Sequence, residues 1–281
     1  MKGWRLLMAI IFGVTLLAPA AFLCTQAHAA SVATPGTGGD VAPAEEPTAK
    51  ATRVQLGLGA AVVPDYEGSK DYKGAPWLFA RVDWPSGMYF LFEGASARMN
   101  LVSSPNWRLG PVLRYIPARD HVQNDQVSDL KEVDAAVMLG GFAGYDFGPW
   151  SAFVQLVQDV SGSNDGYVGT LGVGYAIPVS KELLVAFSAT TNYASGDYMS
   201  TYFGIDAADS ARSGLKTYNA NAGFKDVGAG VLLQYYPWDH WGFRVRAMYT
   251  RLVGDAEDSP VVDKVGDANQ FLGGLMVTYR F

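Results

Sequence analysis

Histidine and cysteine are the first side chains to examine for proton transfer, nucleophilic attack or zinc binding. The sequence has three histidines, His28, His121 and His240, and a single cysteine, Cys24. His28 and Cys24 lie in an N-terminal segment that we expect to be removed, and neither remaining histidine lies beside a serine motif of the hydrolase type. The strand pattern described below places His121 and His240 at opposite ends of the fold. We therefore predict no catalytic residue, no metal site and no cofactor.

Carboxylates gather in three stretches that could bind divalent cations. These are Asp65, Glu67 and Asp71; Asp125, Asp129 and Glu132; and Asp255, Glu257 and Asp258. None has the regular spacing of a calcium-binding loop, so we expect solvated loops. The glycine-rich stretch 169–174 alternates as a strand does and has no helix after it, which favours close packing over phosphate binding.

The composition favours a membrane protein made of strands. Charged residues make up 17% of the chain, below the ~25% of an average soluble domain, while aromatic residues reach 13% and there are 32 glycines. After the first thirty residues no apolar run approaches the ~18 to 20 residues of a spanning helix. The formal net charge of −6 argues against a nucleic-acid partner.

The N-terminus has the order of a secretory signal peptide. Lys2 and Arg5 precede an apolar run, and the small residues Ala27 and Ala29 follow it. We predict a signal peptide over 1–29, cleaved between Ala29 and Ala30, a flexible periplasmic leader over 30–50 and one barrel domain over 51–281.

Apolar residues alternate with small or polar ones from residue 53 to the end. In the first segment Leu56, Leu58 and Val62 alternate with Gln55 and Gly57. An apolar face would meet lipid and a small or polar face would meet a wet lumen, as in outer-membrane barrels. The fold class predicted is an all-β transmembrane antiparallel barrel with short periplasmic turns and longer extracellular loops.

The alternation marks eleven segments, at 53–63, 75–84, 88–102, 107–116, 133–147, 150–161, 166–177, 182–193, 227–237, 241–252 and 271–281. Bacterial single-chain barrels, however, have an even number of strands. The stretch 88–102 is long for one strand and has Gly94 near its middle, so we divide it and predict about 12 strands, with 10 possible. Long loops are expected at 117–131, 193–226 and 253–270. Within 193–226, Asp206 and the following alanines predict a short helix, lying either over the barrel mouth or inside it.

Six tryptophans outside the signal peptide lie at or near predicted strand ends, which is typical of an interfacial girdle. They are Trp77, Trp84, Trp107, Trp150, Trp238 and Trp241. The last strand carries Tyr279 and ends on Phe281, the type of C-terminus that we interpret as a barrel-assembly signal.

Arginines recur at positions that alternate with apolar residues. The candidate lumen charges are Arg108, Arg114, Asp159, Arg244 and Arg246. On the lipid face each charge would cost about 2 to 4 kcal/mol near the bilayer midplane, so we expect them in the lumen or at a rim. There they either line a pore or pair with inward acids, for which Glu93, Asp134 and Asp159 are candidates. We favour a plugged or narrow lumen over an open channel.

From about residue 54 onward, several short sequence motifs resemble those of the MltA-interacting protein (MipA/OmpV) family of Gram-negative outer-membrane proteins. They are Val63-Pro-Asp-Tyr-Glu-Gly-Ser69, Trp107-Arg-Leu-Gly-Pro-Val-Leu-Arg-Tyr115, Gly148-Pro-Trp150 with Gln158-Asp-Val-Ser-Gly162, Tyr198-Met-Ser-Thr-Tyr-Phe-Gly204, Arg251-Leu-Val-Gly-Asp-Ala256 with Asp258-Ser-Pro-Val-Val262, and Tyr279-Arg-Phe281.

The resemblance implies a non-enzymatic barrel in the cell outer membrane. It implies a scaffold that bridges a murein lytic transglycosylase and a penicillin-binding murein synthase, with a porin-like channel or an adhesin as alternatives. An outer-rim hydrolase is the least favoured function. Outer-membrane lipid, lipopolysaccharide and the barrel-assembly machinery are further expected partners.

Deleting Phe281 is expected to slow insertion into the outer membrane without changing export, because the C-terminal aromatic acts only after the chain has crossed the inner membrane. Fractionation and the mobility shift of unheated samples on gels measure both steps. Normal assembly of the truncated protein would contradict the assigned role.

Overall fold

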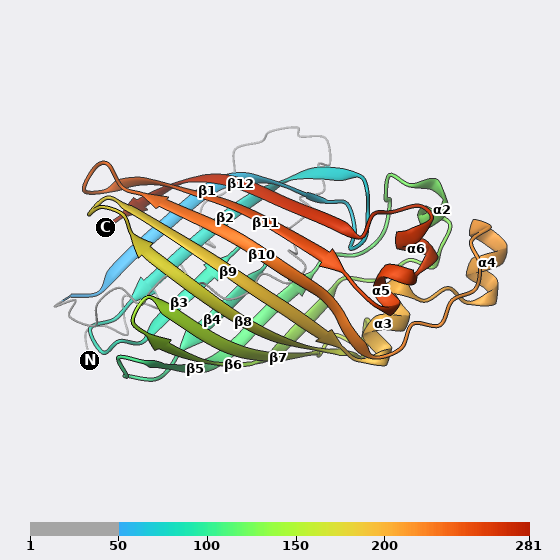
Figure 1. Ribbon diagram of the computed structural model, residues 1–281, viewed down its shortest axis with the longest axis horizontal. Helices are drawn as coiled ribbons and strands as arrows, with labels where there is room; N and C mark the ends of the chain where they lie inside the picture. Colours follow the sequence, from blue (N-terminus) through green and yellow to red (C-terminus); the bar gives the residue numbers. More distant parts are fainter. Residues whose placement is uncertain (1–50) are drawn as a thin grey trace, which may run out of the picture.

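The alternating segments pair into a closed antiparallel barrel in the computed structural model, which describes residues 51–281 (Figure 1). Within those residues the strands are β1 (Arg53–Pro64), β2 (Tyr72–Asp83), β3 (Tyr89–Glu93), β4 (Ser96–Asn100), β5 (Trp107–Ile116), β6 (Ala136–Phe147), β7 (Trp150–Asp159), β8 (Tyr167–Pro178), β9 (Leu183–Ala194), β10 (Gly223–Tyr235), β11 (Trp241–Leu252) and β12 (Asn269–Arg280). Each strand pairs with its neighbour in sequence, and β12 pairs with β1 to close the barrel. The prediction of an all-β barrel of about 12 strands is confirmed.

Short helices gather at one end of the barrel, at the right in Figure 1, and the C-terminus lies at the other end. They are α2 (Asp125–Ser128), α3 (Gly196–Phe203), α4 (Ala207–Ser213), α5 (Asp255–Asp258) and α6 (Pro260–Asp263). The long loops and helices mark the extracellular end, and the tight turns mark the periplasmic end. No helix of the described part of the chain has the length and apolarity to cross a membrane. The predicted signal peptide and leader lie outside the described residues.

The outer surface of the barrel is apolar between two aromatic rims. Leu58, Leu171 and Leu275 are each more than half exposed on this surface, where lipid would cover them. The exposed aromatic residues near the rims are Trp107, Tyr145, Phe147, Trp150, Tyr235, Trp238, Trp241 and Phe281 towards the periplasmic end, and Tyr72, Tyr115, Tyr167, Tyr193, Phe224, Tyr249 and Phe271 towards the extracellular end. Phe187 of β9 is also exposed, between the two rims.

The prediction that Trp77 belongs to the girdle is wrong, because Trp77 is 5% exposed and packs inside the barrel with Phe79 and Ala61. Tyr279 lies at the periplasmic rim, with its ring centroid 4.9 Å from that of Trp241 and 4.8 Å from that of Phe281.

The divided stretch 88–102 forms the short hairpin β3–β4, which turns at Gly94 with a φ of 60°. Because β3 is short, β2 pairs with it only from Phe79 to Asp83. The outer part of β2 therefore has an edge without a paired strand, and Pro76 lies on it. Proline has no N–H to leave unpaired, so sheets tolerate it on such an edge. Gln123 binds the Tyr72 carbonyl at the outer end of the same edge, with an Nε2–O distance of 3.2 Å.

The helix expected after Asp206 is present as α4. The Asp206 side chain caps it by accepting from the Asp209 amide, and Gly214 ends it with a φ of 73°. The cap hydrogen bond lowers the pKa of the Asp206 carboxyl, because it stabilises the ionised form. Figure 1 shows α4 beyond the mouth, farther from the barrel than α3.

Candidate functional site

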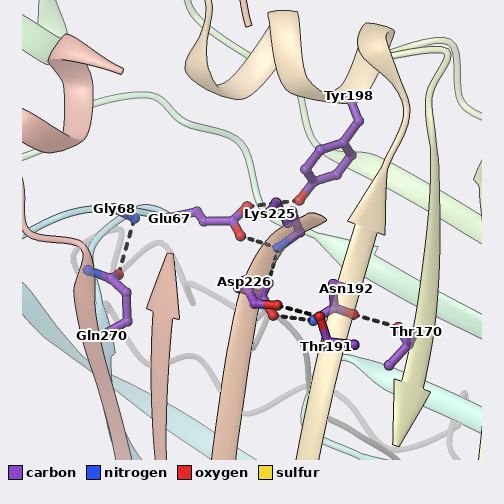
Figure 2. Close-up of polar contacts among 9 residues, drawn as sticks. All are labelled: Glu67, Gly68, Thr170, Thr191, Asn192, Tyr198, Lys225, Asp226 and Gln270. Atoms are coloured by element: carbon purple, nitrogen blue, oxygen red, sulfur yellow. Dashed lines mark hydrogen bonds and ion pairs between the residues drawn. The ribbon is translucent and has the colours of Figure 1, made fainter. Parts of the chain in front are cut away.

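A buried ion cluster joins the extracellular loops to the barrel wall, and Figure 2 shows its members. The Lys225 side chain is 2% exposed and pairs with Glu67, from the β1–β2 loop, and with Asp226, whose Oδ2 lies 2.6 Å from Nζ. A register shift between Phe224 and Asp226 turns both Lys225 and Asp226 inward. This β-bulge places adjacent charges of opposite sign on the same face of one strand.

Hydrogen bonds extend the cluster across three strands. Asn192 Nδ2 donates to Asp226 Oδ1 at 2.7 Å, and Thr170 Oγ1 donates to Asn192 Oδ1 at 2.6 Å (Figure 2). Thr191 Oγ1 donates to the Asp226 carbonyl at 2.8 Å. The Asp226 carboxylate is therefore held by a cation and an amide, so its burial is compensated.

The Tyr198 hydroxyl joins α3 to the same cluster by donating to Glu67 Oε2 at 2.9 Å (Figure 2). Burial raises the pKa of the Tyr198 phenol well above its ordinary value, and the Glu67 carboxylate raises this pKa further. The phenol therefore stays protonated and acts as the donor. Glu67 is thus held by both the Lys225 ammonium and the Tyr198 hydroxyl.

Apolar packing surrounds the ion cluster at the extracellular mouth. Met199 and Phe203 of α3 are both 0% exposed and belong to one core with Met138, Val157 and Val168 of the barrel wall. A second apolar cluster lies among the outer loops and contains Tyr66, Val127, Leu130, Ile205, Leu215, Val261 and Val265. Within 193–226, α3 therefore packs over the mouth, whereas the helix expected after Asp206, α4, lies beyond it (Figure 1).

Hydrogen bonds between loops also hold α3 and the β1–β2 loop in place. Arg119 donates to the Tyr202 carbonyl at 2.8 Å, and Ser259 donates to the Phe203 carbonyl at 2.7 Å, so two other loops hold the end of α3. Gln270 of β12 accepts from the Gly68 amide at 3.1 Å, as Figure 2 shows. The mouth is covered by side chains and backbone from four different loops.

Deeper in the barrel, Glu93 faces two of the predicted lumen charges. Arg244 lies 3.6 Å and Arg246 3.7 Å from its carboxylate oxygens. Arg108 pairs with Asp146 at 2.5 Å, and the two side chains are 10% and 13% exposed. The pairing expected for Glu93 is therefore present, whereas the sequence had not singled out Asp146.

Arg114 is buried at 6% exposure and, unlike these arginines, forms no ion pair with a carboxylate among residues 51–281. The carboxylates of Glu67 and Asp226 in the ion cluster, as well as Arg98, lie close enough to interact with it electrostatically. The ion cluster therefore balances part of the Arg114 charge without a direct contact.

The expected roles of Asp159 and Asp134 need correction. Asp159 forms no ion pair with an arginine among residues 51–281; it accepts from the backbone amides of Ser161, Asn164 and Asp165 at 2.7 to 3.0 Å. The short β7–β8 loop folds back over this carboxylate and satisfies it locally. Asp134 is exposed and lies outside the strands.

Two loop carboxylates differ from the expectation of solvated groups. The Glu67 side chain is only 8% exposed because it belongs to the ion cluster. The Asp65 side chain is 6% exposed and pairs with Lys73, with 3.1 Å between Oδ1 and Nζ. Among residues 51–281 no group of three His, Cys, Asp or Glu side chains is arranged to hold a metal ion. His121 is 90% exposed, and His240 Nδ1 lies 2.8 Å from the Arg280 carbonyl at the opposite end.

Arg108 and Arg114 should respond unequally to neutralisation. Arg108→Met leaves the Asp146 carboxylate without its cation and should lower the free energy of unfolding by about 3 to 5 kcal/mol. Arg114→Met removes a buried charge that has no direct ion pair among residues 51–281, so it should cost clearly less. Urea unfolding in detergent micelles measures both variants. Equal destabilisation by the two substitutions would contradict the charge assignment.

Solved structures with a similar fold are outer-membrane barrels. The translocator domain of the autotransporter NalP from Neisseria meningitidis is 11% identical, with a TM-score of 0.45, covering 83% of this chain and 89% of that domain. The COG4313 outer membrane channel from Pseudomonas putida F1 is 10% identical, with a TM-score of 0.43, covering 82% of this chain and 96% of the channel.

Similar sequences carry outer-membrane names. Outer membrane protein OmpV of Vibrio cholerae is 30% identical over 196 residues, which cover 70% of this chain and 72% of the relative. The MltA-interacting protein of Escherichia coli is 25% identical over 232 residues, covering 82% of this chain and 90% of the relative. The family model described as "MltA-interacting protein MipA" matches residues 56–281. The chain therefore belongs to the MipA family and is a β-barrel of the cell outer membrane.

Proposed function

We propose that the protein is a non-catalytic barrel, closed to solutes, that anchors murein enzymes at the periplasmic face of the outer membrane. The family description and the name of the Escherichia coli relative both state an interaction with MltA. The proposed partners are a murein lytic transglycosylase and a penicillin-binding murein synthase, bound through the short periplasmic turns and the leader 30–50.

The sealed extracellular mouth carries this proposal. Lys225, Glu67 and Tyr198 connect a strand, the β1–β2 loop and α3 by buried polar contacts. Opening the mouth would require these groups to separate inside an apolar surround, which is costly unless water or another partner replaces each contact. A barrel built in this way favours anchoring over free diffusion of solutes.

A porin-like channel is the second candidate, and the arginine-rich interior favours it. Rings of arginine in a water-filled pore select anions. If the mouth opened, Arg244 and Arg246 would face the passing solute. An adhesin acting through the outer loops is a further alternative, whereas the separation of His121 from His240 disfavours a hydrolase.

Conductance separates the anchor from the channel. The wild-type barrel in a planar bilayer should show little or no steady current, because α3 covers the mouth. Replacing 197–220 by a short Gly-Ser linker should open an anion-preferring current. Removing only 206–213, which contains α4 and lies beyond the seal, is the matched control and should leave the barrel silent. A large steady current in the wild type would overturn the closed-barrel proposal.

Binding of a purified murein lytic transglycosylase tests the anchor directly. The detergent-solubilised protein should retain the enzyme on an affinity matrix. Asp239→Lys, in an exposed periplasmic turn, should weaken retention by reversing a surface charge at the proposed contact face. Asp263→Lys is the control, because Asp263 is exposed at the extracellular end. The anchor would be rejected if the enzyme showed no retention above an unrelated barrel, or if only the control variant weakened binding.

A further inference from the structure

A cavity of about 190 Å³ lies inside the periplasmic end of the barrel. Its lining combines side chains from β1, β2, β10, β11 and β12 with the turn between β8 and β9. The turn residues Ser180, Lys181 and Glu182 are exposed, so the cavity opens towards the periplasm. It is therefore separate from the extracellular mouth over which α3 packs.

The arginines in the wall are already engaged by other groups of the protein. Asp83 holds Arg81 through three hydrogen bonds of 2.8 to 3.0 Å. Glu93 lies 3.6 Å from Arg244. The third arginine, Arg280, stacks on a tyrosine ring, with 3.2 Å between the guanidinium carbon and the ring centroid. These contacts make the arginines poor partners for an anion, so charge does not define the ligand of this cavity.

Two glutamine amides in the same wall lack hydrogen-bond partners. Gln55 and Gln234 are only 3% and 8% exposed. Gln55 Oε1 accepts from the Tyr236 hydroxyl at 3.2 Å, which leaves its NH₂ group without a partner among residues 51–281. No hydrogen bond joins the Gln234 amide to any group in the same residues. Most buried polar side chains in proteins are hydrogen-bonded, so these two amides indicate a partner from outside the chain.

The surrounding structure holds both amides in fixed positions. Thr278 Oγ1 donates to the Tyr236 hydroxyl at 3.0 Å, and this hydroxyl in turn orients Gln55. Gln234 lies on β10 directly opposite Leu184 of β9, which contributes apolar surface to the cavity. The lining therefore combines preorganised neutral polar groups with apolar surface, which is what a specific small-ligand site requires.

We propose that this cavity binds one neutral sugar ring that enters from the periplasm. A side-chain amide has one acceptor oxygen and two N–H donors, so it can bind two neighbouring hydroxyl groups at once. Leu183, Leu184 and Pro178 offer apolar surface to the C–H groups of the ring. The volume is below the ~300 to 1,000 Å³ of pockets for drug-sized ligands, which limits the occupant to a single ring. The site does not depend on the anchoring of murein enzymes, so either proposal can fail without the other.

Calorimetric titration of the protein purified from the outer membrane, in a detergent without a sugar headgroup, tests the site with glucose and with N-acetylglucosamine. Saturable binding of at least one sugar is expected. Tighter binding of glucose identifies a free hexose, tighter binding of N-acetylglucosamine identifies an amino sugar of the murein type, and similar affinities support their shared ring chemistry. Glycerol, which has hydroxyl groups but no ring, should bind at least about tenfold more weakly. Binding of neither sugar, or equally tight binding of glycerol or of the anion succinate, overturns the proposal.

Two variants locate the binding. Gln234→Leu removes one amide at nearly constant size and should weaken the sugar affinity by about tenfold or more. Gln155→Leu is the matched control, because Gln155 is a glutamine of β7 that is 2% exposed and does not belong to the lining of the cavity. It should leave the affinity unchanged. An unheated gel shift reports folding of each variant. Wild-type affinity in Gln234→Leu, or equal weakening by Gln155→Leu, would overturn the assignment.

Discussion

The buried ammonium of Lys225 is the interaction on which the closed end of this barrel depends. Lys225 and Asp226 are adjacent in the chain, and the bulge in β10 lets both point inward. Glu67 then crosses from the β1–β2 loop to share the ammonium, and Tyr198 brings α3 to the Glu67 carboxylate. Removing any one of these four side chains would leave a buried polar group without one of its partners, so the loops are held together more firmly than surface loops are.

Buried polar groups in the rest of the interior also need partners. The apolar residues of the barrel face outward to lipid, so most polar and charged side chains face the lumen and must find their hydrogen-bond and ion-pair partners there. Arg108 and Asp146 satisfy each other, and Glu93 serves both Arg244 and Arg246. Asp83 holds Arg81 in the same way. The packing of α3 over the extracellular mouth agrees with the proposal that the protein makes its contacts on the periplasmic side.

The sequence predicted the strands well because their alternation is local. The strands 107–116 and 241–252 have the bounds that the pattern indicates, and the glycine at 94 divides β3 from β4 as expected. The predicted start of β10 at 227 is wrong, because the strand begins at Gly223. The bulge interrupts the alternation there, so the pattern does not reveal the first four residues.

The site was harder to predict for the same physical reason. Lys225 was assigned to a loop, and its partner Glu67 is 158 positions away in the chain. Asp159 was expected to pair across the lumen, but a short loop supplies its amides first. Local pattern predicts which face a residue occupies, whereas long-range pairing depends on how separate loops fold over one another.

Amide hydrogen exchange of α3 in the folded barrel tests most directly whether the ion cluster holds the mouth closed. In the wild type the amides of 199–203 should exchange nearly as slowly as those of the barrel strands, because local opening must first separate the buried cluster. In Lys225→Met these amides should exchange much faster, while strand amides such as those of 245–250 keep their protection. Fast exchange of α3 in the wild type, or unchanged protection in the variant, would contradict the account.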